Sequence, residues 1–460
     1  MRSAWSLPLP FIHTPGDHGW DDARRAWNLA ADQHPAAVAV PETAHDVVAA
    51  VSFAQDHGLR VAAQGTGHNA VPLGPLDDTV LIKTHAMRQL SIDHTGRIAW
   101  AQAGVLWGEL TAAAAGHELA GLMGSSPDVG VVGYTLGGGL SWLGRSYGLS
   151  ANNVEAVELV TADAELIVAD PYNNPELFWA LRGGGGSFGV VTEIGLRLFR
   201  VPEVYAGLLW WPAESGQQVL HAWRELTSGR VPDEFTTSFR YRNFPASPEV
   251  PAQLRGRSFV VVDVVHVGRP READRLLAPL RGLRPLHDTL RMMSVPELGH
   301  LHGDPDHPVP FMADGALLAS LPADAVDEVV RLAGPDSRSP LLSVELRQLG
   351  AEMGRTRHGN GALAAVPASY FLVATGTVPT QDAAAEVAAR IEALKSALAP
   401  WTAQQVYLNL AGTSTDPSGF WSSLAYARLR RIKASVDPRN MIRANHPIPP
   451  ADRQPQGLIA

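Results

Sequence analysis

The stretch "RVAAQGTGHNA", from Arg60 to Ala70, constrains the fold more than any other part of the sequence. Gly65, Gly67 and Ala70 match the G-x-G-x-x-A spacing of a dinucleotide-binding turn, which needs a helix after the third small residue. The residues that follow are "VPLGPLDD", and their prolines and glycine cannot begin such a helix. The sequence therefore predicts a glycine loop that exposes backbone N–H groups to phosphate oxygens without a Rossmann helix.

Cysteine is absent from all 460 residues, which excludes disulfides, thiolate catalysis and cysteine-ligated metals. Redox chemistry therefore needs a cofactor. The net charge of −9 argues against nucleic acid or an anionic membrane as partner and favours a small molecule. No apolar run is long enough for a membrane span, and the first 20 residues contain no signal-like apolar segment, so we expect a cytoplasmic protein.

The periodicity changes near Pro202. Before it, short helices and strands alternate; after it, longer strands with solitary helices dominate, and this predicts a second domain over residues 201–404. The expected helices lie at 43–58, from about Leu106, around Val219, Ala325 and Ala385, and at 420–435. The expected strands include "LRVAA", "TVLIK", "RIAWAQAG", two within 154–170, "FGVVTEIGLRLF", "YAGLLWW", "FTTSFRYR", "SFVVVDVVHV", "PLLSVELRQL", "SYFLVATG" and "VYLNL".

Two short motifs have competing interpretations. "GGSFG", around Ser187, matches the nucleophile elbow of serine hydrolases, but a strand-like sequence follows it where the elbow needs a helix. "HLHGDPDH", from His300 to His307, has side chains that could bind a metal. Its glycine and prolines favour an ordinary surface loop, so we predict neither a hydrolase nor a metal site.

Four segments, "AAQGTGHNA", "SSPDVGVVGYTLGGGLSWLGRSYGL", "PELFWALRGGGGSFGVVTEIGLRLF" and "DPRNMIRANHPI", occur in an order that resembles the vanillyl-alcohol oxidase superfamily. Within it, the chain is most similar to the berberine-bridge and 6-hydroxynicotine oxidase group. The resemblance implies an α+β fold. Its PCMH-type FAD-binding domain would combine residues 1–200 with a returning segment, 405–460, and its substrate domain, 201–404, would be a large antiparallel sheet covered by helices.

The resemblance also implies how FAD is held. His68 matches the histidine that is bonded to the flavin 8α-methyl; the alternative is a hydrogen-bonding histidine beside a non-covalent flavin. Ser126 stands where some relatives have a cysteine tether, so one covalent bond is the maximum. Gln64 and Thr66 replace the usual arginine and glycine of this loop. The FAD-contacting positions carried over are Gln64, Gly65, Thr66, Gly67, His68, Asn69, Ser126, Val129, Gly130, Gly133, Tyr134, Gly137, Gly138, Gly139, Gly189, Val190, Val191, Asn445 and Pro447.

Strand alternation in "SVELRQLG" places Ser343, Glu345 and Arg347 on one face. The resemblance implies that this face lies toward the flavin. Glu345 is the first candidate for a catalytic base, with Arg347 keeping it ionised or binding an acidic substrate oxygen; the alternative is a structural ion pair. Tyr407 and Asn409 share a face of their predicted strand.

Tyr407 is one phenol that could accept a proton from the substrate, and Tyr134 is the other. Val129 matches the position that is small in relatives that react with oxygen.

These features predict an FAD oxidase that takes a hydride from an alcohol, phenolic or amine carbon of a secondary metabolite and passes electrons to dioxygen. A flavin-dependent oxygenase or cyclase on the same fold, and a flavin-binding protein without catalysis, are the alternatives. We expect a monomer or a homodimer.

Overall fold

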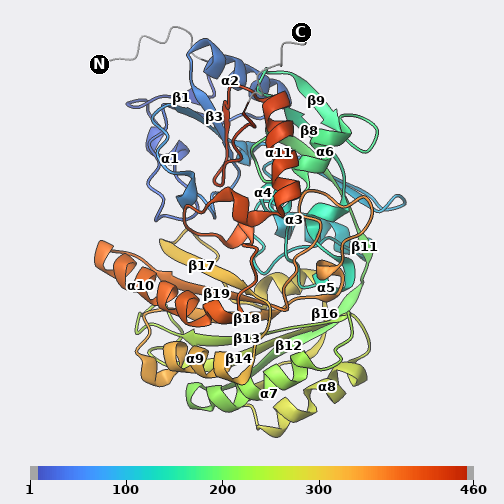
Figure 1. Cartoon of the computed structure of the whole chain (residues 1–460), viewed down its shortest axis with the longest axis vertical. Coiled ribbons are helices and arrows are strands. Elements are labelled where there is room, and N and C mark those ends of the chain that lie inside the picture. The colour runs from blue at the N-terminus through green and yellow to red at the C-terminus, as the bar shows by residue number, and fades with distance from the viewer. Residues whose placement is uncertain (1–8, 453–460) are drawn as a thin grey trace, which may run out of the picture.

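The computed structural model describes residues 9–452; positions 1–8, the first part of the stretch inspected for a signal sequence, lie outside the described residues. The first and last strands of the described chain lie at the same end of the molecule, in one five-stranded sheet (Figure 1). Its order is β1 (Ile12–His13), β2 (Ala37–Ala39), β4 (Thr79–Lys83), β3 (Arg60–Gln64) and β20 (Ile442–Arg443). Because β20 pairs in parallel with β3, the C-terminal segment returns to the predicted glycine loop.

Helix α2 (Ala44–Asp56) covers this sheet. As predicted, the Thr43 hydroxyl accepts a hydrogen bond from the backbone N–H of Asp46, and the Asp46 carboxylate accepts one from the N–H of Thr43. This capping box satisfies N–H groups that a helix start otherwise leaves unpaired. Val47 and Val51 are fully buried against the strands, so the apolar face of α2 fixes the position of β3.

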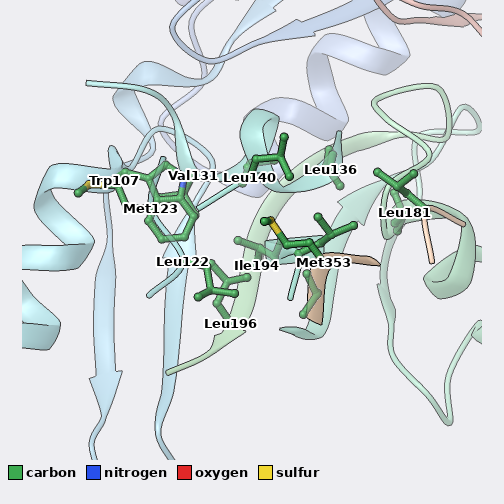
Figure 2. Packing of buried hydrophobic residues seen from close by; sticks show 14 of the residues in the cluster. Trp107, Leu122, Met123, Val131, Leu136, Leu140, Leu181, Ile194, Leu196 and Met353 are labelled. Atoms are coloured by element: carbon green, nitrogen blue, oxygen red, sulfur yellow. The ribbon is translucent and has the colours of Figure 1, made fainter. Parts of the chain in front are cut away.

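A second sheet is antiparallel and also lies in the N-terminal part. Trp107, Val131 and Ile194 belong to the large core between this sheet and its neighbours (Figure 2). The sheet order is β5 (Leu90–Asp93), β6 (Ile98–Gln102), β10 (Val190–Arg197), β8 (Val154–Val160) and β9 (Leu166–Ala169). The helices around it are α3 (Trp107–Ala115), α4 (Val131–Leu136), α5 (Gly144–Tyr147), α6 (Pro175–Leu181) and α11 (Ser423–Val436).

The largest sheet has eight strands and is antiparallel. Helices α7, α8, α9 and α10 lie on its outer side, and its other face is turned toward the N-terminal part (Figure 1). The path is β15 (His287–Asp288), β12 (Glu203–Pro212), β14 (Ser258–His266), β13 (Phe235–Asn243), β18 (Ser343–Gln348), β19 (Tyr370–Thr377) and β17 (Phe311–Leu318), with β16 (Arg291–Ser294) beside β12. The helices are α7 (Gly216–Ser228), α8 (Pro270–Gly282), α9 (Ala323–Ala333) and α10 (Gln381–Leu398).

The smaller elements are α1 (Trp20–Ala23) and the β7 (Leu119–Ala120) and β11 (Phe199–Arg200) pair. The structure adds helix α8 and strand β17, which sequence periodicity missed; Pro279 within α8 obscured the helical pattern.

The predicted strand "VYLNL" is wrong. Leu408–Leu410 forms a 3₁₀ turn and pairs with no strand of the described chain. In this turn the Asn409 side chain donates a hydrogen bond to the backbone carbonyl of Tyr134. Within residues 9–452, no helix combines the length and apolarity needed to cross a membrane.

Candidate active site

A cavity of about 1170 Å³ lies between the inner face of the large sheet and the glycine loops of the N-terminal part. It is somewhat larger than the usual range for small-molecule sites, about 300–1,000 Å³. Its wall takes residues from the loop after β3, from α4, from β13, β18 and β19, and from the 3₁₀ turn at 408–410. Segments far apart in the sequence therefore face one cavity.

His68 lies on this wall and is held from three sides. Its imidazole stacks on Trp27 with ring centroids 4.1 Å apart. Its Nδ1 lies 2.8 Å from the Thr66 hydroxyl oxygen, and its Nε2 lies 3.5 Å from Oδ1 of Asp128. Burial raises the pKa of Asp128, but the interaction with His68 outweighs it, so the pKa lies below its usual value and the carboxylate stays ionised.

Several polar groups on the wall have no protein partner. The backbone N–H groups of Gly67, His68 and Asn69 donate to no acceptor among the described residues. Buried Nε2 of Gln64 and the hydroxyl of Tyr134 also have no hydrogen-bond partner in the described part of the chain. Because buried polar groups are nearly always hydrogen-bonded, this pattern fits a polar ligand that lies against the loop.

The glycines of the wall have two different functions in the fold. A Cβ atom built on Gly133 meets nothing within 4 Å, so this position borders open space that a ligand can fill. A Cβ on Gly137 would lie 1.7 Å from Oδ1 of Asn409, so that glycine is required by the protein's own packing. The cavity thus has a smooth, open backbone surface where a planar or phosphate-bearing cofactor fits.

Most of the predicted cofactor positions line the cavity: Gln64, Gly65, Thr66, Gly67, His68, Asn69, Ser126, Val129, Gly130, Gly133, Tyr134, Gly137, Gly189, Val191 and Asn445. Four do not line it, and their contact with the cofactor stays a prediction. Gly138 and Gly139 turn away from the cavity wall, packed near Tyr407 and Tyr134. Val190 is fully buried between sheets, and Pro447 is exposed on the surface.

The sheet side of the cavity carries a cluster of buried charges. Nε of Arg347 lies 2.7 Å from Oε1 of Glu345, and the other Glu345 oxygen lies 3.0 Å from Nε2 of His302. The second His302 nitrogen lies 2.6 Å from Oδ1 of Asp304. Beside them, Arg240 and Asp263 form a fully buried pair with two N–H···O contacts.

These contacts set the protonation of the cluster. Burial raises the pKa of Glu345, but Arg347 and His302 more than offset it, and the pKa lies well below the ordinary range. For His302, burial and Arg240 lower the pKa, whereas Asp304 and Glu345 raise it, with a net increase. A carboxylate held ionised is a weak proton acceptor by itself, so its contact with His302 matters for any acid–base role.

Tyr134 and Tyr407 also face the cavity. Burial raises the pKa of both phenols. The backbone N–H groups of Gly139 and Leu140 hydrogen-bond to the phenol oxygen of Tyr407 and oppose this rise. Asn409 lies 3.5 Å from the same oxygen, so the two residues that sequence placed together do lie together, on a turn.

The two short motifs have different outcomes. "HLHGDPDH" is the largely exposed loop that was predicted, with one exception: His302 lines the cavity and its side chain is only 12% exposed. Within residues 9–452, no group of three or more potential ligands is arranged to hold a metal ion. Ser187 is buried, its hydroxyl accepts the backbone N–H of Ile448, and strand β10 follows it, so it is not presented as a nucleophile.

Comparison with known proteins identifies two segments of the chain. A model described as "FAD binding domain" matches residues 35–170, and one described as "Berberine and berberine like" matches residues 406–449. The chain is a PCMH-type FAD-linked oxidoreductase with a berberine-like C-terminal segment. It is therefore an enzyme that uses FAD, and the PCMH-type α+β fold predicted from sequence is confirmed.

Individual relatives agree over nearly the whole length. The enzyme is 29% identical to (R)-6-hydroxynicotine oxidase of Paenarthrobacter nicotinovorans, over 98% of this chain and 99% of that protein. The crystal structure of 6-hydroxy-D-nicotine oxidase from Arthrobacter nicotinovorans is 27% identical and superposes with a TM-score of 0.80, covering 96% of this chain and 98% of the other.

The fold is also that of the wild-type BBE-like 1 protein of Physcomitrella patens. That chain is 20% identical, with a TM-score of 0.82 over 96% of this chain and 97% of that chain.

Sequence reasoning missed several residues of the site. Arg240 and Arg242 alternate along β13 in "FRYRN", the same signal that revealed Glu345 and Arg347 on β18, and both line the cavity. Asp128 stands inside the quoted "SSPDVG" motif but was not singled out. Nothing in the local sequence indicates Trp27, because only the tertiary fold brings it onto His68.

Proposed function

We propose that the enzyme oxidises an alcohol, phenolic or amine carbon of a small, secondary-metabolite substrate and delivers the electrons to dioxygen, forming hydrogen peroxide. The observation that carries this proposal is that one cavity joins the FAD-binding loops to a buried acid–base cluster. The substrate loses a hydride from C–H and a proton from O–H or N–H; dioxygen gains both electrons and two protons. Bound FAD supplies the two-electron acceptor.

In this proposal, the loop from Gly65 to Asn69 and the open backbone at Gly130 and Gly133 hold FAD. His68 would hold the flavin through a bond from its imidazole to the flavin 8α-carbon. The bond would replace the imidazole N–H and one 8α C–H, and dioxygen would take up the two electrons and the two protons as hydrogen peroxide. The stacking of His68 on Trp27 and its contacts with Thr66 and Asp128 support this role, because they fix the ring orientation before reaction.

Glu345 is proposed as the group that receives the substrate proton, with His302 as its partner. The 3.0 Å contact between them lets neutral His302 share a proton that reaches Glu345. Arg347 lies over the Trp142 ring, 4.3 Å from its centroid, which fixes the guanidinium beside Glu345. Tyr134 and Tyr407, with Asn409 beside Tyr407, are the next candidates. They rank below Glu345 because burial raises the pKa of both phenols, which keeps them protonated and unable to take a further proton readily.

Peroxide yield per turnover tests the proposal. The holoenzyme is reduced anaerobically with a panel of alcohols, phenols and amines, then mixed with dioxygen. We expect one peroxide per flavin reduced. Retention of oxygen in the product with little peroxide would indicate an oxygenase, and no reduction by any compound would favour the non-catalytic alternative. The division at residues 200 and 404, the cytoplasmic location and the monomer or homodimer state stay predictions.

A further inference from the structure

Arg242 differs from the other arginines of the cavity wall. Arg240 pairs with Asp263, Arg347 with Glu345 and Arg443 with Asp78. Within residues 9–452, Arg242 has no carboxylate within ion-pair distance, and its guanidinium donates instead to the backbone carbonyls of His302, at 2.6 Å, and Gly303, at 3.4 Å. It also lies over the Phe244 ring, 5.0 Å from the centroid. The side chain is therefore held in place while most of its five N–H donors stay available.

Ser343 lies directly opposite Arg242 in the pairing of β13 with β18, and both residues line the cavity. Directly opposed residues in an antiparallel pair have neighbouring side chains on one face. The Ser343 hydroxyl is buried and makes no hydrogen bond to any of the residues that the structure describes. A guanidinium and a hydroxyl, both lacking an acidic partner, thus stand side by side on the cavity wall.

The carboxylates of this wall are already paired. Asp263 pairs with Arg240, Glu345 with Arg347 and His302, and Asp304 with His302. Burial and Arg240 lower the pKa of Arg242 to about 10, which still leaves it charged at neutral pH. Among the described residues of the wall, Arg242 is therefore the arginine whose charge no carboxylate pairs.

We propose that Arg242 and Ser343 form a subsite for an anionic group of the substrate, most simply a carboxylate, so that the enzyme acts on organic acids. This inference rests on the proposed function and narrows its substrate class. Arginine presents a planar fork of donors that matches the two oxygens of a carboxylate, and the serine hydroxyl supplies a further donor. The carbon to be oxidised would lie between this anchor and the cluster at Glu345.

Isothermal titration calorimetry on the holoenzyme tests the subsite with two matched pairs, benzoate against benzamide and phenylacetate against phenylacetamide. We expect each acid to bind at least about tenfold more tightly than its amide, as charged hydrogen bonds allow. R242M should weaken acid binding by about ten- to a hundredfold and remove the preference, and R242K should restore part of it. S343A should weaken acid binding a few-fold.

R257M is the matched control, because Arg257 stacks on Phe259 in the same manner but does not line the cavity. It should leave acid binding unchanged. Equal binding of acid and amide in the wild type, no saturable acid binding, or loss of FAD from R242M would overturn the proposal; the last outcome would assign Arg242 to the cofactor. Calorimetry does not depend on turnover, whereas peroxide yield does, so failure of the subsite and failure of the oxidase proposal are separate results.

Discussion

Nε2 of His302 lies 3.0 Å from Oε2 of Glu345, although a glycine- and proline-rich loop supplies one residue and the middle of a strand the other. Neither group alone is suited to accept a proton at neutral pH. Glu345 is held ionised by Arg347 and His302, and His302 is held protonated by Asp304 and Glu345 at pH values where a free histidine is neutral. Because the two groups are in contact, they exchange and bind protons as a pair.

Glu345→Gln is expected to slow anaerobic flavin reduction by about 10²- to 10⁴-fold, the usual contribution of general base catalysis. The pair with Arg347 is also buried, with side chains 3% and 10% exposed, so the variant should lose stability as well, by up to about 3–5 kcal/mol. Stopped-flow reduction and thermal unfolding measure the two effects.

Asp437→Asn is the control for that experiment, because it breaks the equally buried pair with Lys433 outside the cavity. It should lower the melting temperature without changing the reduction rate per bound flavin. A normal reduction rate in Glu345→Gln would remove Glu345 as the base and leave Tyr407 and Tyr134 as candidates.

His302 should give the reaction an ascending pH dependence. Its pKa lies above the ordinary 6.5, so the pair gains capacity to accept a proton only as pH rises through that raised value. The rate of flavin reduction should increase across this range, and His302→Gln should remove the ascending limb. A profile that is the same in both proteins would contradict the coupling to Glu345.

The same pKa shift predicts the pH dependence of stability. Because the folded state binds the His302 proton more tightly than the unfolded state, the stabilisation is complete below pH 6.5 and is lost as pH rises through the folded pKa. The wild-type melting temperature should therefore fall relative to that of His302→Gln over this interval. Differential scanning calorimetry at closely spaced pH values measures the difference; parallel curves would argue against it.

His68 should carry the flavin covalently. Acid-precipitated wild-type protein is expected to stay yellow, whereas His68→Ala should release the colour into the supernatant. Asp128→Asn should reduce the attached fraction, because it removes the charge 3.5 Å from Nε2 that orients the ring. His34→Ala changes an exposed histidine and serves as the control. Colour lost equally from all four proteins would mean non-covalent FAD.

Val129 borders the cavity beside the glycine loop, and its small side chain is expected to leave room for dioxygen. Val129→Ile adds one methylene there and should slow flavin reoxidation more than flavin reduction. Val131→Ile adds the same group in the core, away from the cavity wall, and should only lower stability, by about 1–3 kcal/mol. Equal slowing of both half-reactions in Val129→Ile would assign Val129 to packing.

Sequence alone determined the parts of this protein that depend on local pattern. Period-2 alternation placed Glu345 and Arg347 on one face, the Thr43 and Asp46 box fixed the start of α2, and proline after Ala70 excluded a Rossmann helix. Such features depend on residues a few positions apart, whose geometry the backbone itself sets.

Only the tertiary structure decided which distant groups meet. It brought Trp27 onto His68 and His302 onto Glu345, and it left Arg242 without a carboxylate partner among residues 9–452. It also made part of "VYLNL" a 3₁₀ turn, in which the Asn409 side chain donates to the backbone carbonyl of Tyr134, far away in sequence. Protonation and pairing in a buried cluster depend on all neighbours in space, and the order of residues along the chain does not specify them.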